Sequence, residues 1–75
     1  MTADQFERQM RDYLRRDPFE PFVVWTDSNQ SIVIDNPLAV ALASGGAGYM
    51  APEQIHFIES AHVVEIRSIS SQAAS

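Results

Sequence analysis

The first sixteen residues carry the most regular pattern of apolar and polar positions in the chain. Their apolar side chains recur at helical spacing and would form one stripe, made of Phe6, Met10, Tyr13 and Leu14. Thr2 and Gln5 have the spacing of a capping box, in which each side chain bonds to the backbone N–H of the other residue. Because Pro18 disfavours helical geometry at the residue before it, the pattern predicts a helix over about residues 3–16.

The rest of the chain alternates short apolar runs with polar breaks, which is typical of short strands. Aromatic and β-branched residues fill the runs FVVWT and SIVID, on either side of the turn-forming break DSNQ. The pattern predicts strands over about residues 21–26, 31–35, 54–59 and 62–69. Residues 38–50 are harder to interpret, and 38–44 can be a strand or a helical turn. The tail, residues 70–75, has nothing to bury and is predicted to be disordered.

These elements predict a single domain over residues 1–69, mainly β with one N-terminal α-helix. Strands this short and numerous must close into a barrel or a strongly bent sheet. We therefore expect a small, strongly bent antiparallel barrel of four to five strands. Its last two strands are expected to pair with each other as a closing hairpin or strand pair.

The first two strands carry apolar residues on both faces. The residues expected to fill the interior are Phe22, Val24, Ile32 and Ile34, and those expected to point outward are Val23, Trp25 and Val33. The apolar stripe of the helix is the nearest cover for the outward residues, and a second subunit is the alternative. Trp25 is part of the core if the helix covers it, which we favour, and an anchor for a partner if it stays exposed.

Composition removes several classes of protein. The chain has 75 residues and no cysteine, so disulfides and thiolate zinc sites are absent, and stability must come from a compact core or from oligomerisation. No segment approaches the roughly 20 apolar residues that span a bilayer, and the charged N-terminus lacks the apolar region of a signal peptide. The expectation is a soluble, cytoplasmic protein with no membrane association.

Charge is unevenly distributed along the chain. The first sixteen residues hold four of the five basic residues, all arginine, whereas the remainder holds one arginine and seven acids. Arg8, Arg11 and Arg15 share one edge of the predicted helix and are the candidate nucleic-acid contacts. The acidic body disfavours nucleic acid because it repels a phosphate backbone, and acids in the same helix can pair with these arginines.

Candidate chemistry is sparse. His56, Glu59, His62 and Glu65 invite a metal or acid–base site, but their spacing matches no ligand signature. The glycine-rich stretch SGGAG matches neither a dinucleotide-binding nor a phosphate-binding loop and is interpreted as a flexible turn. We therefore predict no catalytic residue, no metal and no cofactor.

The chain resembles the Sm-like (SH3-type) small barrels, which include the bacterial RNA-chaperone ring. The resemblance runs through the N-terminal helix, the stretch PFVVWTDSNQSIVID and the closing stretch IHFIESAHVVEIRSI. The chain is also similar to small uncharacterised bacterial proteins with a PFxPF entry and a terminal H-(I/V)-x-x-I strand, here PFEPF and residues 62–66. The resemblance implies a helix-capped, five-stranded bent barrel that forms rings or dimers. Ser28–Asn29 replaces the family's usual glycine turn, and no RNA-binding residue carries over.

These observations predict a bacterial, cytoplasmic module for protein binding or self-assembly, without catalytic activity and forming a ring or dimer. The expected contact surface consists of Val23, Trp25, Val33 and Ile69. The alternative is an Sm-like nucleic-acid-binding protein that uses Arg8, Arg11 and Arg15, with Tyr13 and Trp25 as stacking surfaces.

Overall fold

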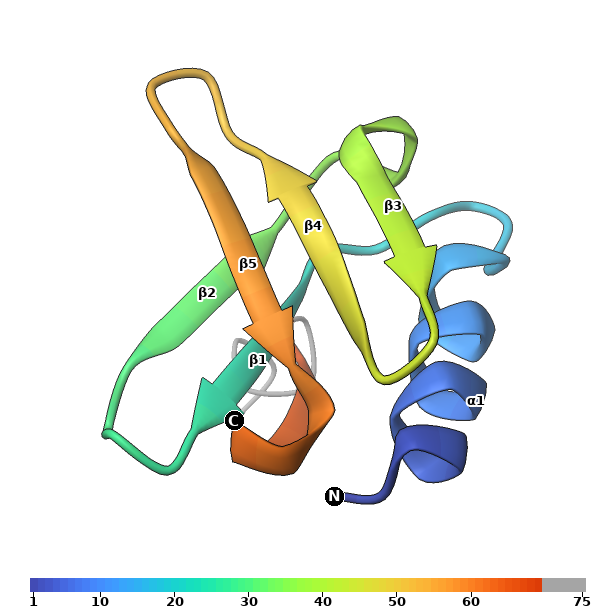
Figure 1. Ribbon diagram of the computed structural model, residues 1–75. Coiled ribbons are helices and arrows are strands. Elements are labelled where there is room, and N and C mark those ends of the chain that lie inside the picture. Colours follow the sequence, from blue (N-terminus) through green and yellow to red (C-terminus); the bar gives the residue numbers. More distant parts are fainter. Residues whose placement is uncertain (70–75) are drawn as a thin grey trace.

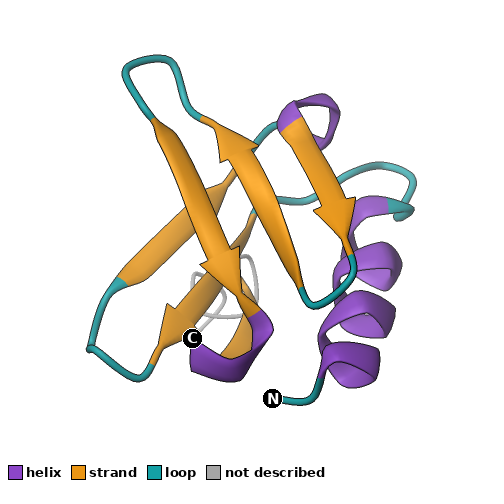
Figure 2. Ribbon diagram, viewed as in Figure 1, coloured by secondary structure: helices purple, strands orange, loops and turns teal. Residues whose placement is uncertain are grey.

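The computed structural model of the protein describes residues 1–69. Its elements follow in the order α1 (Ala3–Leu14), β1 (Phe22–Thr26), β2 (Ser31–Ile34), η1 (Pro37–Ala39), β3 (Val40–Ala43), β4 (Gly46–Met50), β5 (Ile55–Glu59), η2 (Ser60–His62) and β6 (Val63–Ser68). Figure 1 shows α1 beside two crossing layers of strands, and Figure 2 marks the short 3-10 turns η1 and η2 among the helical segments. The expected class, mainly β with one N-terminal helix, is confirmed.

The strands form two antiparallel sheets of three strands each. Sheet A has the order β2-β1-β6 and sheet B the order β3-β4-β5. The closed barrel predicted from the sequence is wrong, because within residues 1–69 no strand of one sheet is hydrogen-bonded to a strand of the other. One cause is η1, where Pro37 has no N–H and the Asn36 side chain accepts the Leu38 N–H at 3.0 Å, so the chain leaves extended geometry between β2 and β3.

The segment left open by the sequence, residues 38–44, contains both of the alternatives. It begins inside the helical turn η1 and continues as β3, which pairs along its whole length with β4. A tight turn joins these two strands, and Gly45 adopts a φ of 80° there, a conformation that glycine reaches without steric cost. Local pairing across this turn therefore makes a strand out of a segment rich in alanine.

The expected pairing of the last two strands is wrong. β5 pairs with β4 in sheet B, and β6 pairs with β1 in sheet A. Between them η2 carries the chain from one sheet to the other, and backbone hydrogen bonds tie the turn to both sides. The Ser60 N–H donates to the Gly45 carbonyl at 2.9 Å, and the His62 carbonyl accepts from the Asp27 N–H at 2.8 Å.

Helix α1 begins with the predicted capping box, in which Thr2 Oγ1 accepts from the Gln5 N–H and Gln5 Oε1 accepts from the Thr2 N–H. The helix ends at Leu14, two residues before the predicted end, and Arg15 forms its C-cap. No helix within residues 1–69 has the length and apolar character needed to cross a membrane.

The core lies where the two sheets and the helix meet. Phe6 and Met10 of α1 are fully buried in the same cluster as Phe22 and Val24 of β1, together with Ile58 of β5. The helix therefore packs on the inner side of the sheets and closes the core. The expectation that it covers the outward residues of β1 and β2 is wrong.

A polar bond joins the two sheets near β3. The Tyr49 hydroxyl of β4 donates to Asp35 Oδ1, just after β2, at 2.7 Å. This hydrogen bond to the carboxylate raises the pKa of Tyr49 above its usual value of 10.0.

Candidate functional site

The outer face of sheet B is almost entirely apolar. Its residues alternate with the buried Ala47, Tyr49 and Ile58, and they are Ala41, Ala43, Gly46, Gly48, Met50, Ile55, Phe57 and Glu59. We call this set the apolar face. The exposed fraction is 82% for Phe57, 64% for Met50 and 55% for Ile55. Large apolar residues exposed together on one sheet mark an interaction surface more often than isolated ones do.

The register of sheet B explains why Phe57 stands so far out. Its partner across the ladder is Gly48, which has no side chain, and the next strand places Ala41 beside Gly48. A Cβ built on Gly48 would meet no atom of residues 1–69 within 4 Å, so none of them fills the space beside the Phe57 ring. Small neighbours therefore leave the aromatic ring uncovered.

β5 is an edge strand of sheet B, and its open edge presents backbone groups. Hydrogen-bonded and non-hydrogen-bonded pairs alternate along an antiparallel ladder. The bond from the Ser60 N–H to the Gly45 carbonyl fixes the phase of this alternation for β4 and β5. It follows that Ile55, Phe57 and Glu59 direct their N–H and C=O groups away from β4, toward the open edge.

A shallow groove runs beside this edge. Phe57, Ile58 and Glu59 line it from β5, and the other lining residues are Thr26, Asp27, Ser28, Gln30, Ile32 and His62. The groove therefore separates β5 from β2 and from the turn between β1 and β2. Both the apolar face and the groove are bounded by the same strand.

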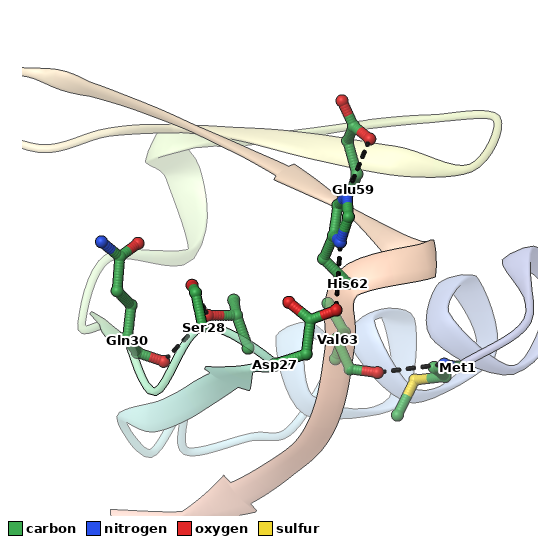
Figure 3. Close-up of polar contacts among 8 residues, drawn as sticks. Met1, Asp27, Ser28, Gln30, Glu59, His62 and Val63 are labelled. Atoms are coloured by element: carbon green, nitrogen blue, oxygen red, sulfur yellow. Dashed lines mark hydrogen bonds and ion pairs between the residues drawn. The ribbon is translucent and has the colours of Figure 1, made fainter.

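His62 lines the groove and lies between two acids (Figure 3). Its Nδ1 is 3.2 Å from Asp27 Oδ2 in the β1–β2 turn, and its Nε2 is 3.6 Å from Glu59 Oε2 of β5. The hydrogen bond with Asp27 is the main cause that raises the pKa of His62 above its usual 6.5, and the charges of Asp27 and Glu59 act in the same direction. All three side chains are more than half exposed, so water screens this cluster strongly.

The four residues that suggested a metal or acid–base site do not converge. His62 contacts Glu59, but His56 stacks on Tyr49 with ring centroids 6.3 Å apart, and Glu65 binds Arg67. Among residues 1–69 no group of three or more His, Cys, Asp or Glu side chains is arranged to hold a metal ion.

The contact surface expected from the sequence lies on the outer face of sheet A and is only partly exposed. Trp25 is 36% and Val33 50% exposed, but Val23 is only 4% exposed and has no free surface to offer. Ile69 is half-buried just after β6, where its N–H donates to the Pro21 carbonyl. Trp25 is not part of the core cluster that contains Phe6 and Met10, so its expected cover by the helix is also wrong.

The candidate nucleic-acid residues are exposed on α1, but the edge is not a clean cationic surface. Arg11 binds Glu7 at 2.7 Å, while Arg8 and Arg15 are exposed. Tyr13 offers little for base stacking, because its ring stacks on Phe22 with centroids 4.9 Å apart and the Arg16 guanidinium lies 4.2 Å from the ring centroid. The helix is thus partly salt-bridged, and its aromatic residue is engaged in packing.

Sequence reasoning missed Met50, Ile55 and Phe57. The available signal was the alternation in IHFIE, where His56 and Ile58 share one face and Ile55 and Phe57 the other. That alternation does not say which face is covered. Gly48, opposite Phe57, decides it, and its register follows only from the fold.

Comparison of the chain with protein-family models, with curated proteins and with solved structures finds no match.

Proposed function

We propose that this protein is a non-catalytic module that binds another polypeptide through the apolar face of sheet B. The observation that carries the proposal is the exposure of Phe57, Met50 and Ile55 on adjacent strands, over a floor of glycine and alanine. Aromatic residues and methionine are enriched where proteins bind each other, and charged residues are depleted at the centre of such surfaces. Glu59 is the single charged residue of the apolar face and stands at its margin.

Burial of this face would provide the driving force for binding. A fully buried phenylalanine or methionine side chain contributes about 1.5–3 kcal/mol relative to an exposed one. Because Gly48 leaves room beside Phe57, a partner side chain can pack against the ring without moving the sheet. The polar cluster of Asp27, His62 and Glu59 would then lie at the rim, where solvated ionic groups set orientation more than affinity.

We also propose that the fold is an open relative of the Sm-like small barrels. What supports this is the order of elements, with an N-terminal helix before short antiparallel strands and a last strand that returns beside the first. The proposal does not extend to RNA, because Arg11 is paired with Glu7 and Tyr13 is packed on Phe22.

The proposal is tested with a photo-cross-linking amino acid placed at Met50 or Phe57 in the cells that naturally make the protein. Leu38 in η1 is the matched control position, because it is 93% exposed and lies outside the apolar face. We expect discrete cross-linked protein adducts from positions 50 and 57, and none from position 38. A result in which the two face positions behave like Leu38 would overturn the proposal.

A further inference from the structure

We propose that a second copy of this chain occupies the edge of β5, in an antiparallel pairing with a two-fold axis at Phe57. The inference rests on the proposed function, since β5 carries Ile55 and Phe57 of the apolar face. Its central observation is that the open edge of β5 is self-complementary in register. The resulting dimer would join two copies of sheet B into one continuous sheet.

Within residues 1–69 the edge of β5 has few of the features that commonly protect edge strands. Proteins block such edges with lysine, proline, bulges or inward-pointing charges, or cover them with a helix or loop. β5 has the sequence IHFIE, and its pairing with β4 runs through all five residues without a register shift. Within residues 1–69 no other strand pairs with the open edge of β5, and the outward backbone groups of Ile55 and Phe57 have no hydrogen bond, while Glu59 is also the N-cap of η2. A mostly apolar edge without a bulge is a template for another strand.

The register of the pairing between two β5 strands follows from which residues direct their backbone N–H and C=O groups to the open edge. Ile55, Phe57 and Glu59 are the residues with edge-facing groups, and Phe57 is the middle residue of the strand. A two-fold axis at this position places each Phe57 opposite the other as a hydrogen-bonded pair. It also places each Ile55 opposite the Glu59 of the second copy. These three pairs would form about six backbone hydrogen bonds.

Side chains in this arrangement are compatible. Both Phe57 rings would stand side by side on the same outer face, where cross-strand aromatic pairs are favourable. The two Glu59 side chains would be four residues apart along the ladder, or about 14 Å. That separation exceeds the Debye length of about 8–10 Å near physiological salt, so their repulsion is largely screened.

The open edges of sheet A suit this role less well. β2 directs only Ser31 and Val33 outward, because the bond from the Thr26 N–H to the Gln30 carbonyl fixes the opposite phase for Ile32 and Ile34. The edge of β6 is partly used by the helix, since the Tyr13 hydroxyl donates to the Ile66 carbonyl. In contrast, the groove beside β5 leaves its edge accessible from solvent.

Single cysteines test this register directly, because the natural chain has none. The variants are Ile55→Cys and Glu59→Cys, purified separately and then mixed under mild oxidation. In the proposed dimer their Cα atoms face each other at about 5.5 Å, within the roughly 4.4–6.8 Å that a disulfide allows. Either variant alone would place its two cysteines about 14 Å apart. We expect roughly tenfold or more mixed disulfide dimer than either homodimer.

Light scattering supplies the second measurement on the unmodified chain and on Phe57→Pro. The Phe57 N–H faces the open edge, so proline removes a dimer bond and no bond to β4. Phe57→Ala, which keeps the N–H, is the matched control for loss of the ring. We expect the dimer fraction of the natural chain to rise with concentration, to fall in Phe57→Ala and to vanish in Phe57→Pro, with circular dichroism unchanged.

The outcomes separate this inference from the proposed function. A monomeric natural chain, or homodimers that cross-link as readily as the mixed pair, would overturn the two-fold pairing of β5. If cross-linking in cells then still joins position 57 to a different protein, the proposed function stands without this partner. If positions 50 and 57 give no adduct and the chain is monomeric, both proposals fall.

Discussion

The outer faces of the two sheets differ in how far neighbouring side chains cover an apolar residue. On sheet A, Val23 is only 4% exposed although it points away from the core cluster. Its partners on either side are Val33 and Arg67, and Trp25 lies two residues along the same strand. On sheet B, Phe57 is 82% exposed because Gly48 stands beside it. The exposure of an apolar side chain on a sheet is therefore set as much by the size of its neighbours as by the side of the sheet it occupies.

This difference has a consequence for binding. The outer face of sheet A buries Val23, although Trp25 and Val33 stay partly exposed, and it pairs its charges, since Arg67 Nε donates to Glu65 Oε2 at 2.9 Å. On the apolar face of sheet B, Phe57 has only Gly48 and then Ala41 across from it, and the face carries one charge. Sheet A thus buries part of its outer apolar surface within residues 1–69, whereas Phe57, Met50 and Ile55 of sheet B stay largely uncovered there.

The same substitution on the two faces is expected to give the largest contrast. Val23→Ser removes buried apolar volume and buries a hydroxyl, so we expect a loss of about 2–3 kcal/mol in the free energy of unfolding. Phe57→Ser removes an exposed ring, and its effect is expected to stay within about 0.5 kcal/mol. Urea unfolding of both variants measures this. Equal losses would show that the two faces are equally covered and would remove the basis of the comparison.

Two glycines of β4 sharpen the comparison within sheet B. A Cβ on Gly46 would lie 2.6 Å from the Ile58 carbonyl oxygen, a backbone atom that cannot move aside cheaply. Gly46→Ala should therefore cost about 2 kcal/mol through overpacking. Gly48→Ala meets open space and should raise stability by up to about 1 kcal/mol, because it lowers the entropy of the unfolded chain. Thermal unfolding compares the two, and a costly Gly48→Ala would mean that the open space beside Phe57 is filled.

Much of the fold could be predicted from local patterns, and the site could not. The capping box at Thr2, the helical stripe through Phe6 and Met10, and the first hairpin each depend on a few neighbouring residues. The position of Phe57 beside Gly48 depends instead on the register of two strands joined by a polar loop. The weak strand signal of the sequence GAGYM gave no means to fix that register.

The closed barrel failed for a related reason. Strand count and length indicate that a sheet must bend, but they do not say where its ladder breaks. Two short 3-10 turns decide this, at Pro37–Ala39 and at Ser60–His62. The second of these turns sends β6 to sheet A and leaves β5 as an edge, so the candidate site exists because of a turn that the sequence pattern did not reveal.

The hydrogen bond between Tyr49 and Asp35 tests how independent the two sheets are. Tyr49→Phe keeps the buried ring and removes the hydroxyl, so we expect a loss of about 1 kcal/mol. Asp35→Asn retains an acceptor oxygen and should lose less. Chemical denaturation followed at the single tryptophan, Trp25 on sheet A, and by circular dichroism of the whole chain measures both variants. If the unfolding transitions seen by the two probes coincide in the natural chain and separate in Tyr49→Phe, this hydrogen bond keeps the two sheets in one cooperative unit.

The smallest expected effect concerns His62, which joins the β1–β2 turn of sheet A to the end of β5. Asp27 and Glu59 raise the pKa of His62 above 6.5, so the protonated imidazole is favoured in the folded chain. Its contribution to stability is therefore complete well below pH 6.5 and is lost as the pH rises through the raised pKa. The stability difference between the natural chain and His62→Gln should shrink from below about pH 6 to above about pH 8.

Nuclear magnetic resonance of the imidazole ring separates the two acids that act on His62. Asp27→Asn removes the main cause of the shift, so the pKa of His62 should fall further in this variant than in Glu59→Gln. If the pKa of His62 instead fell further in Glu59→Gln, the main interaction of His62 would be with Glu59 of β5 and not with Asp27 of the β1–β2 turn. Because the cluster is solvated, added salt should weaken both effects, whereas the contrast between Val23 and Phe57 depends on packing and should persist.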